Sequence, residues 1–277
     1  KVVVAEAKCL RAYYYLVLVT NYGNVTLVTT ESTDTKIMNP TRSSQEEIYN
    51  LIITDLQEAA ADLNTTPMDG NYARVTKKAA LGLLARAYAQ GAGEGLSENG
   101  VSYWQRAKEV AEDLIANMAS YNAYLYDDVE DVWAQSNNRN NKEALFIASG
   151  PQAGTDAFTY GSYGANKLFT FTFCDPNKLS DIYGQGTRDL RQTHWFKTSW
   201  GTSYLLKHNA DLEYAKEKVR MITLAEMYYI AAECLLRKND PKAADYFNAV
   251  LESRGLVALD DRIPAESLTI EKITQER

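Results

Sequence analysis

Residues 5–28, AEAKCLRAYYYLVLVTNYGNVTLV, are the stretch that indicates the fold most clearly. Small and apolar residues recur in it at helical spacing, on one stripe: Ala5, Cys9, Ala12 and Leu16. The consecutive residues Tyr13, Tyr14 and Tyr15 point about 100° apart, so at least two of them need cover from other elements. Gly23 is a typical residue for ending a helix. We therefore expect a central helix of a helical fold.

Both ends of the sequence lack the signals that open or close a structural element. Residues 1–4 carry no helix cap and no signal peptide, and residues 269–277 open an amphipathic helix without a stop signal. We therefore expect the excised core of a longer protein. In such a core, the helices at 10–19 and 270–273 would lose partners and leave apolar faces uncovered.

Composition excludes several classes of protein. The 277 residues suffice for one large domain or two, and 45% of them are hydrophobic. The net charge is −7 and there is no basic run, which disfavours nucleic acid as a partner. Cys9, Cys174 and Cys234 are odd in number and far apart, so they predict neither a disulfide framework nor a zinc site. The longest apolar run is too short to span a membrane.

Two pairs of helices follow from the helical spacing of apolar residues, one at 77–90 and 103–118 and the other at 219–238 and 241–253. The first helix is rich in small residues, which allow a neighbouring backbone to come close: Ala79, Ala80, Gly82, Ala85 and Ala87. Large, small and aromatic residues match the spacing of tetratricopeptide repeats in both pairs. Ordinary helical bundles produce similar spacings.

The segment 119–217 has a different character, because it is loop-rich and aromatic. Residues 143–149 and 168–173 predict short strands within it. We expect this segment to lie over the helical scaffold as an insertion, with a separate domain as the alternative.

The ordered set of these elements resembles the SusD/RagB family of outer-membrane glycan-binding lipoproteins. The resemblance rests on these residues, in this order: 5–15, 22–28, 47–49, 52, 55–56, 59, 74–77, 79–80, 83–86, 88, 103–104, 107, 189–191, 220, 224–233, 247–250 and 254–255. It covers nearly the whole chain. Set against the family, we expect this sequence to lack the lipidated amino-terminal stretch and the carboxy-terminal end, and with the upstream stretch a part of the ligand site.

The resemblance implies an all-α fold of tetratricopeptide-like helix pairs, arranged as a right-handed α-α superhelix, with an inserted loop-rich region carrying short strands. It implies a single SusD-like domain over 1–277, made of the amino-terminal helices 1–118, the insertion 119–217 and the second helix pair 218–277. Its implied function is non-catalytic: a surface-exposed outer-membrane lipoprotein holds an oligosaccharide over a SusC-like TonB-dependent transporter. Contact with the membrane would come only from a lipid anchor outside this chain.

Candidate glycan-binding residues come from chemistry, because sugar rings stack on aromatic side chains while polar groups meet their hydroxyls. Six residues of the polar, aperiodic stretch suit this role: Tyr163, Tyr183, His194, Trp195, Trp200 and Tyr204. The alternative is that these rings pack the insertion onto the helices, since large aromatic residues are mostly buried. The family shares no ligand motif, so no binding residue can be transferred from it.

Cofactors, metals and catalysis have little support in the sequence. Two histidines are too few for a multi-histidine metal site or most catalytic triads. The acidic run 127–131 lacks the ligand alternation of a calcium-binding EF-hand loop, which favours a solvated turn. We therefore expect no cofactor, no metal and no enzyme. A helical-repeat scaffold that binds protein and a glycoside hydrolase, which needs only two carboxylates, remain the alternatives.

Overall fold

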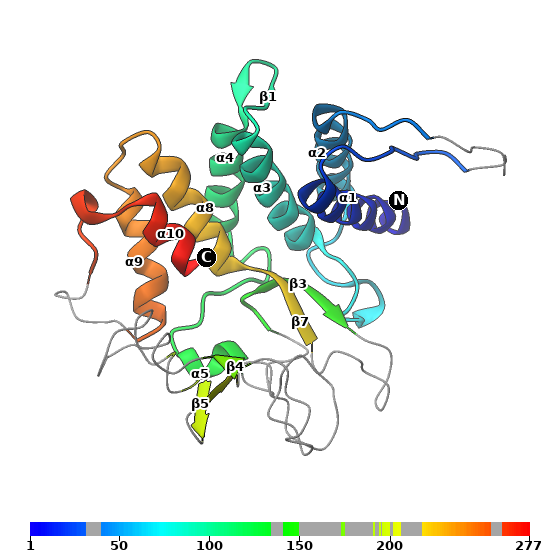
Figure 1. Cartoon of the computed structure of the whole chain (residues 1–277). Coiled ribbons are helices and arrows are strands. Elements are labelled where there is room, and N and C mark those ends of the chain that lie inside the picture. The colour runs from blue at the N-terminus through cyan, green and yellow to red at the C-terminus, as the bar shows by residue number, and fades with distance from the viewer. Residues whose placement is uncertain are drawn as a thin grey trace. The chain divides into compact units, whose positions relative to one another are not determined.

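The computed structural model describes residues 1–31, 40–133, 141–149, 173–174, 191, 194, 196–199, 202–205, 218–255 and 262–277. The chain divides into two compact units, residues 1–121 and 122–277. Among the described residues of both units, more lie in helices than in strands, and the strands are short (Figure 1). The predicted all-α class is therefore confirmed. None of the helices in the described ranges combines the length and the apolar character that a membrane span requires.

The first unit is a row of helices in which α2 packs against α1 and α3, and α3 packs against α4 (Figure 1). A short antiparallel hairpin joins α3 to α4, and a turn of 3-10 helix, η1, precedes α3. The bounds are α1 Val2–Tyr22, α2 Gln45–Asp62, η1 Met68–Gly70, α3 Lys77–Gly93, β1 Ser97–Glu98, β2 Val101–Ser102 and α4 Tyr103–Ala116. A capping box between Ser44 and Glu47 starts α2.

A small residue near the end of α3 brings its neighbours close, and it lies beyond the predicted end of this helix at residue 90, because α3 continues to Gly93. A Cβ atom added at Gly91 would lie 2.8 Å from Cδ2 of Tyr103 and 3.2 Å from Cδ1 of Tyr49. Tyr103 is buried and its ring packs edge-on against Tyr88, with centroids 5.0 Å apart. Because the ring has little room to move, the contact between α3 and α4 requires glycine at position 91.

We predict that Gly91→Ala destabilises the protein by about 1–3 kcal/mol, because the added methyl group overpacks the interface of α3 and α4. Gly93→Ala is the matched control, since a Cβ atom there meets nothing within 4 Å. It should be neutral or stabilising, because alanine favours a helix more than glycine does. Urea denaturation of both variants measures the difference, and equal stabilities would contradict this packing.

Helix α1 is buried along the predicted stripe of Ala5, Cys9, Ala12 and Leu16. Its opposite side is exposed and apolar, with large side chains at Val3, Val4, Leu10, Tyr14, Val17, Leu18 and Tyr22. Tyr15 is buried, Tyr13 is half-buried and Tyr14 is 62% exposed. The expected uncovered apolar face on residues 10–19 is therefore present. The prediction of a central helix is wrong for this structure, because other elements cover α1 on one side.

Ion pairs fasten α1 to its neighbours. Arg11 donates two hydrogen bonds of 2.7 Å to Asp55 on α2. Glu6 of α1 is buried, and its carboxylate binds Arg74 in the segment before α3. Such bidentate pairs between arginine and carboxylate fix orientation as well as distance.

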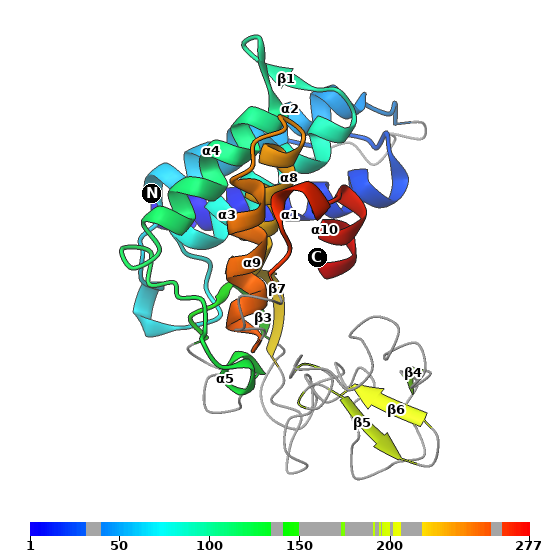
Figure 2. The ribbon, with the colours of Figure 1, turned by 90° about the vertical axis from the view of Figure 1, so that its left-hand side faces the viewer.

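The second unit combines the helix pair α8 and α9 with short strands (Figure 2). Strand β3 pairs with β7, three further strands form a sheet in the order β4-β6-β5, and α10 packs against α8. The bounds are α5 Val129–Trp133, β3 Ala144–Ser149, β4 Phe173–Cys174, β5 Phe196–Ser199, β6 Thr202–Leu205, β7 Lys218–Thr223, α8 Leu224–Leu236, α9 Ala243–Ser253, η5 Ala265–Ser267 and α10 Ile270–Glu276.

Both predicted helix pairs are in contact, but two expectations for the second unit need correction. The helix predicted from residue 219 begins at Leu224, because Lys218–Thr223 forms β7. This strand is rich in β-branched residues and pairs with β3, from Ser149 opposite Lys218 to Ala144 opposite Thr223. No local pattern reveals a partner so far away in the sequence. The expectation that residues 270–273 leave an apolar face uncovered is also wrong at Ile273, because this residue is 1% exposed.

The predicted strand at 143–149 is confirmed as β3. Of the strand predicted at 168–173, only Phe173 belongs to the described residues, where it opens β4. The division into 1–118, 119–217 and 218–277 stays a prediction.

Candidate functional site

Strands β3 and β7 pair with each other and form the base of the aromatic region, residues 150–217. In the sequence, this region follows β3 and precedes β7. All six candidate residues lie in sequence between these strands. The antiparallel register places Ala148 opposite Val219 and Ser149 opposite Lys218. At the other end of the ladder, the amide of Leu224 donates to the carbonyl of Glu143 over 2.7 Å. Ser149 and Lys218, which flank residues 150–217 in the sequence, are therefore held side by side.

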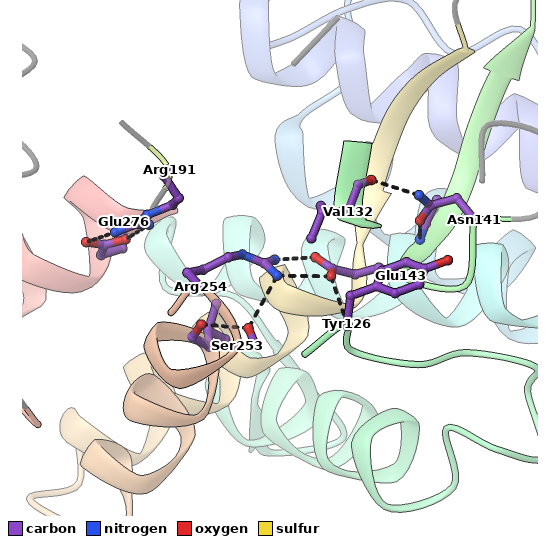
Figure 3. A network of polar contacts seen from close by, with 10 residues as sticks. Tyr126, Val132, Asn141, Glu143, Arg191, Ser253, Arg254 and Glu276 are labelled. Carbon is purple, nitrogen blue, oxygen red and sulfur yellow. Dashed lines mark hydrogen bonds and ion pairs between the residues drawn. The ribbon is translucent and has the colours of Figure 1, made fainter. Parts of the chain in front are cut away.

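A buried ion pair supports this base. The side chains of Glu143 and Arg254 are 1% and 5% exposed, and the guanidinium binds both carboxylate oxygens (Figure 3). Arg254 also donates to the hydroxyl of Ser253 over 3.3 Å, and the amide of Tyr126 donates to Glu143 over 3.4 Å. The pair connects the start of β3 with the end of α9 and with the chain before α5.

Asn141 extends the polar network at the entrance to β3. Its side chain donates to the carbonyl of Val132 in α5 over 2.9 Å and accepts from the amide of Ala144 over 2.8 Å (Figure 3). Asn141 is buried, so both bonds form away from water. Buried polar groups of this kind fix one arrangement of the chain, because any other arrangement leaves them unsatisfied.

A second buried arginine, Arg191, ties the aromatic region to the carboxy-terminal helix. It donates to the two carboxylate oxygens of Glu276 in α10 over 2.5 and 3.3 Å (Figure 3). Arg277 in turn pairs with Glu226 and Glu233 of α8. Burial, and then the charge of Glu276, raises the pKa of Tyr229, which keeps that phenol neutral in the core of this unit.

We predict that Glu143→Gln costs about 3–5 kcal/mol of unfolding free energy, because it leaves the buried Arg254 without its counter-ion. Glu58→Gln is the control, since Glu58 is exposed and pairs with Lys8 at the surface. That change should cost less than about 1 kcal/mol. Chemical denaturation gives both values, and a cost for Glu143→Gln as small as that of the control would refute the structural role of the pair.

The structure places two of the six sequence-predicted residues. His194 Nδ1 lies 3.0 Å from a carboxylate oxygen of Glu130 in α5, and its side chain is partly exposed. Tyr204 belongs to β6, opposite Phe173 of β4 and Lys197 of β5. Tyr163, Tyr183, Trp195 and Trp200 lie outside the described residues. Whether the six rings meet in one site therefore stays a prediction.

Sequence reasoning missed several residues that organise this region. Glu143 and Arg254 carry no local signal, because their partnership joins positions 111 residues apart. Tyr124 and Tyr126 stand immediately before the acidic run, and the alternation of aromatic residues there is the signal that could have selected them. Among the residues with described positions, no cluster of three or more His, Cys, Asp or Glu side chains could hold a metal ion.

Comparison with known families gives two matches along the chain. Residues 116–277 match the model of the SusD family, and residues 1–89 match a SusD-like family described as starch-binding and associating with the outer membrane. A SusD-like protein of Bacteroides ovatus is 31% identical over 147 residues, which are 51% of this chain and 25% of that protein.

Solved structures share the fold over almost the whole chain. A SusD homologue from Bacteroides thetaiotaomicron aligns with a TM-score of 0.75 at 20% identity, over 99% of this chain and 64% of that one. A laminarin-binding SusD-like protein aligns with a TM-score of 0.70 at 20% identity, over 99% and 66%. A structure with xylogluco-oligosaccharide aligns with a TM-score of 0.72 at 21% identity, over 99% and 61%. The chain thus spans about two thirds of the length of these structures.

Proposed function

Because the chain belongs to the SusD family, whose model matches more than half of it, we propose that it binds an oligosaccharide or polysaccharide without cleaving it. The family match is the observation that carries this proposal. A glycan ligand is further supported by the laminarin-binding protein and by the structure with xylogluco-oligosaccharide, which share its fold.

The proposed binding residues are the six aromatic and imidazole side chains between Tyr163 and Tyr204. Trp195, Trp200 and Tyr204 would supply stacking surfaces, and Tyr163, Tyr183 and His194 would add further contacts to the sugar. The β4-β6-β5 sheet supports this proposal, because it gives Tyr204 a regular hydrogen-bonded backbone. His194 stands beside an exposed carboxylate, and this combination suits recognition of sugar hydroxyls.

The absence of catalysis is part of the proposal. Hydrolysis of a glycosidic bond requires two carboxyl groups on opposite sides of the scissile bond. The most deeply buried carboxylate described, that of Glu143, is enclosed in the protein interior and bound by Arg254, where a sugar has no access.

We further propose a place at the outer-membrane surface and delivery of the glycan to a SusC-like TonB-dependent transporter. The description of the family matched by residues 1–89 supports the location.

Isothermal titration calorimetry of the chain with laminari-, xylogluco- and malto-oligosaccharides tests the binding. We expect at least one of the three to bind and no reducing sugar to be released during incubation. Absence of binding to all three would contradict the proposal and favour a helical-repeat scaffold that binds protein. Release of reducing ends would favour a glycoside hydrolase.

We predict that Trp195→Ala and Trp200→Ala each weaken glycan binding about fivefold or more. Stacking of a base on an aromatic ring contributes about 1–3 kcal/mol, and a tenfold change in affinity corresponds to about 1.4 kcal/mol. Tyr22→Ala serves as the control, because Tyr22 is an exposed aromatic residue at the end of α1. Wild-type affinity in both tryptophan variants, with folding verified by circular dichroism, would show that these rings only pack.

A further inference from the structure

Tyr124 is an exposed aromatic side chain in the second unit, whose other described large apolar groups are covered. It is 43% exposed, and among the residues described in 122–277 it is the one exposed large apolar or aromatic side chain. An isolated exposed ring is common at protein surfaces. Tyr124 differs from that ordinary case in the hydrogen bonds that fix it and in the polar side chains nearby.

The backbone around Tyr124 is fixed at three successive points. The amide of Tyr124 donates to the carbonyl of Lys142 over 3.1 Å, and the amide of Lys142 donates to the hydroxyl of Tyr126 over 3.1 Å. The amide of Tyr126 donates to Glu143, the buried partner of Arg254. The backbone that carries the exposed ring is therefore anchored to the buried ion pair through Tyr126, two residues further along.

The ring itself is also oriented. Tyr126 is buried and packs against it in a T-shaped arrangement, with centroids 5.7 Å apart and an angle of 87°. Such a contact covers at most one face of Tyr124. The hydroxyl of Tyr124 donates to the carboxylate of Asp127, and this bond raises the pKa of the phenol. The ring is thus held neutral and in one orientation before any ligand arrives, which lowers the entropy cost of binding.

Polar groups of both kinds lie on the two chain segments that meet at Tyr124, residues 122–131 and Lys142. Asp127 is exposed, and Asp131 is close enough for its charge to act on the Tyr124 phenol. On the other chain segment, the ammonium group of Lys142 donates to the side-chain oxygen of Asn122. A carboxylate accepts several hydrogen bonds and an ammonium group donates three, so hydroxyl groups beside the ring can meet donors and acceptors.

We propose that Tyr124 is the stacking platform of a subsite for one neutral sugar ring, with Asp127 and Lys142 binding its hydroxyl groups. This subsite rests on the proposed glycan binding but lies outside the residues 163–204 assigned to it above. The acidic side chains of 127–131 disfavour uronic acids and other anionic sugars, because like charges repel.

The binding test compares Tyr124→Ala with Tyr14→Ala against the same laminari-, xylogluco- and malto-oligosaccharides. Tyr14 is the matched control, because it is an exposed tyrosine on α1. We expect Tyr124→Ala to weaken binding about tenfold, which corresponds to about 1.4 kcal/mol, and Tyr14→Ala to leave the affinity unchanged. Tyr124→Phe keeps the ring and should retain affinity within about threefold.

Hydroxyl-radical footprinting of the wild-type chain gives a second readout that no folding defect can affect. A saturating glycan should slow oxidation of Tyr124 and leave that of Tyr14 unchanged. Equal oxidation of Tyr124 with and without bound glycan, or wild-type affinity in Tyr124→Ala, would overturn the subsite while leaving the proposed function intact. If none of the three glycans binds the wild type, the proposed function fails and the subsite fails with it.

Discussion

The buried pair of Glu143 and Arg254 is the interaction on which the second unit depends. Removing two charges from water is costly, and the cost is recovered only when each charge stays close to the other and keeps its hydrogen bonds. The pair therefore allows one arrangement of the three segments that meet at it: the chain at Tyr126, the start of β3 and the end of α9. Strand β3 begins directly after Glu143, and β7 ends beside it. The aromatic region proposed to bind glycan therefore has a fixed base.

The helical part of the fold could be predicted because its signals are local. The stripe from Ala5 to Leu16 and the small residues of α3 recur at the helical period, and the structure buries both. The error at Val219 has the opposite cause, since a strand gains its stability from a partner that lies far away in the sequence. The sequence of α1 is apolar on both sides, and such a pattern does not say which side is covered.

For the candidate site, the sequence predicts the types of side chain but not their arrangement in space. A stretch rich in Trp, Tyr and His indicates sugar stacking, but its spacing contains no information on which rings share a surface. His194 illustrates the difficulty, because its partner Glu130 is 64 positions away and nothing in the local sequence connects them. The sequence does not single out Tyr124, for a similar reason. Its distinctive features are its exposure, its bond to the carbonyl of Lys142 and the bond of the neighbouring Tyr126 to Glu143, and these exist only in the folded chain.

A double-mutant cycle on Glu143→Gln and Arg254→Met tests most directly whether this pair organises the unit. The two substitutions remove one charge each, and urea denaturation gives the unfolding free energy of the wild type, both single variants and the double variant. Our account predicts strong coupling, with the double variant no less stable than the weaker single variant and a coupling free energy of about 2 kcal/mol or more. Additive effects of the two substitutions would contradict it.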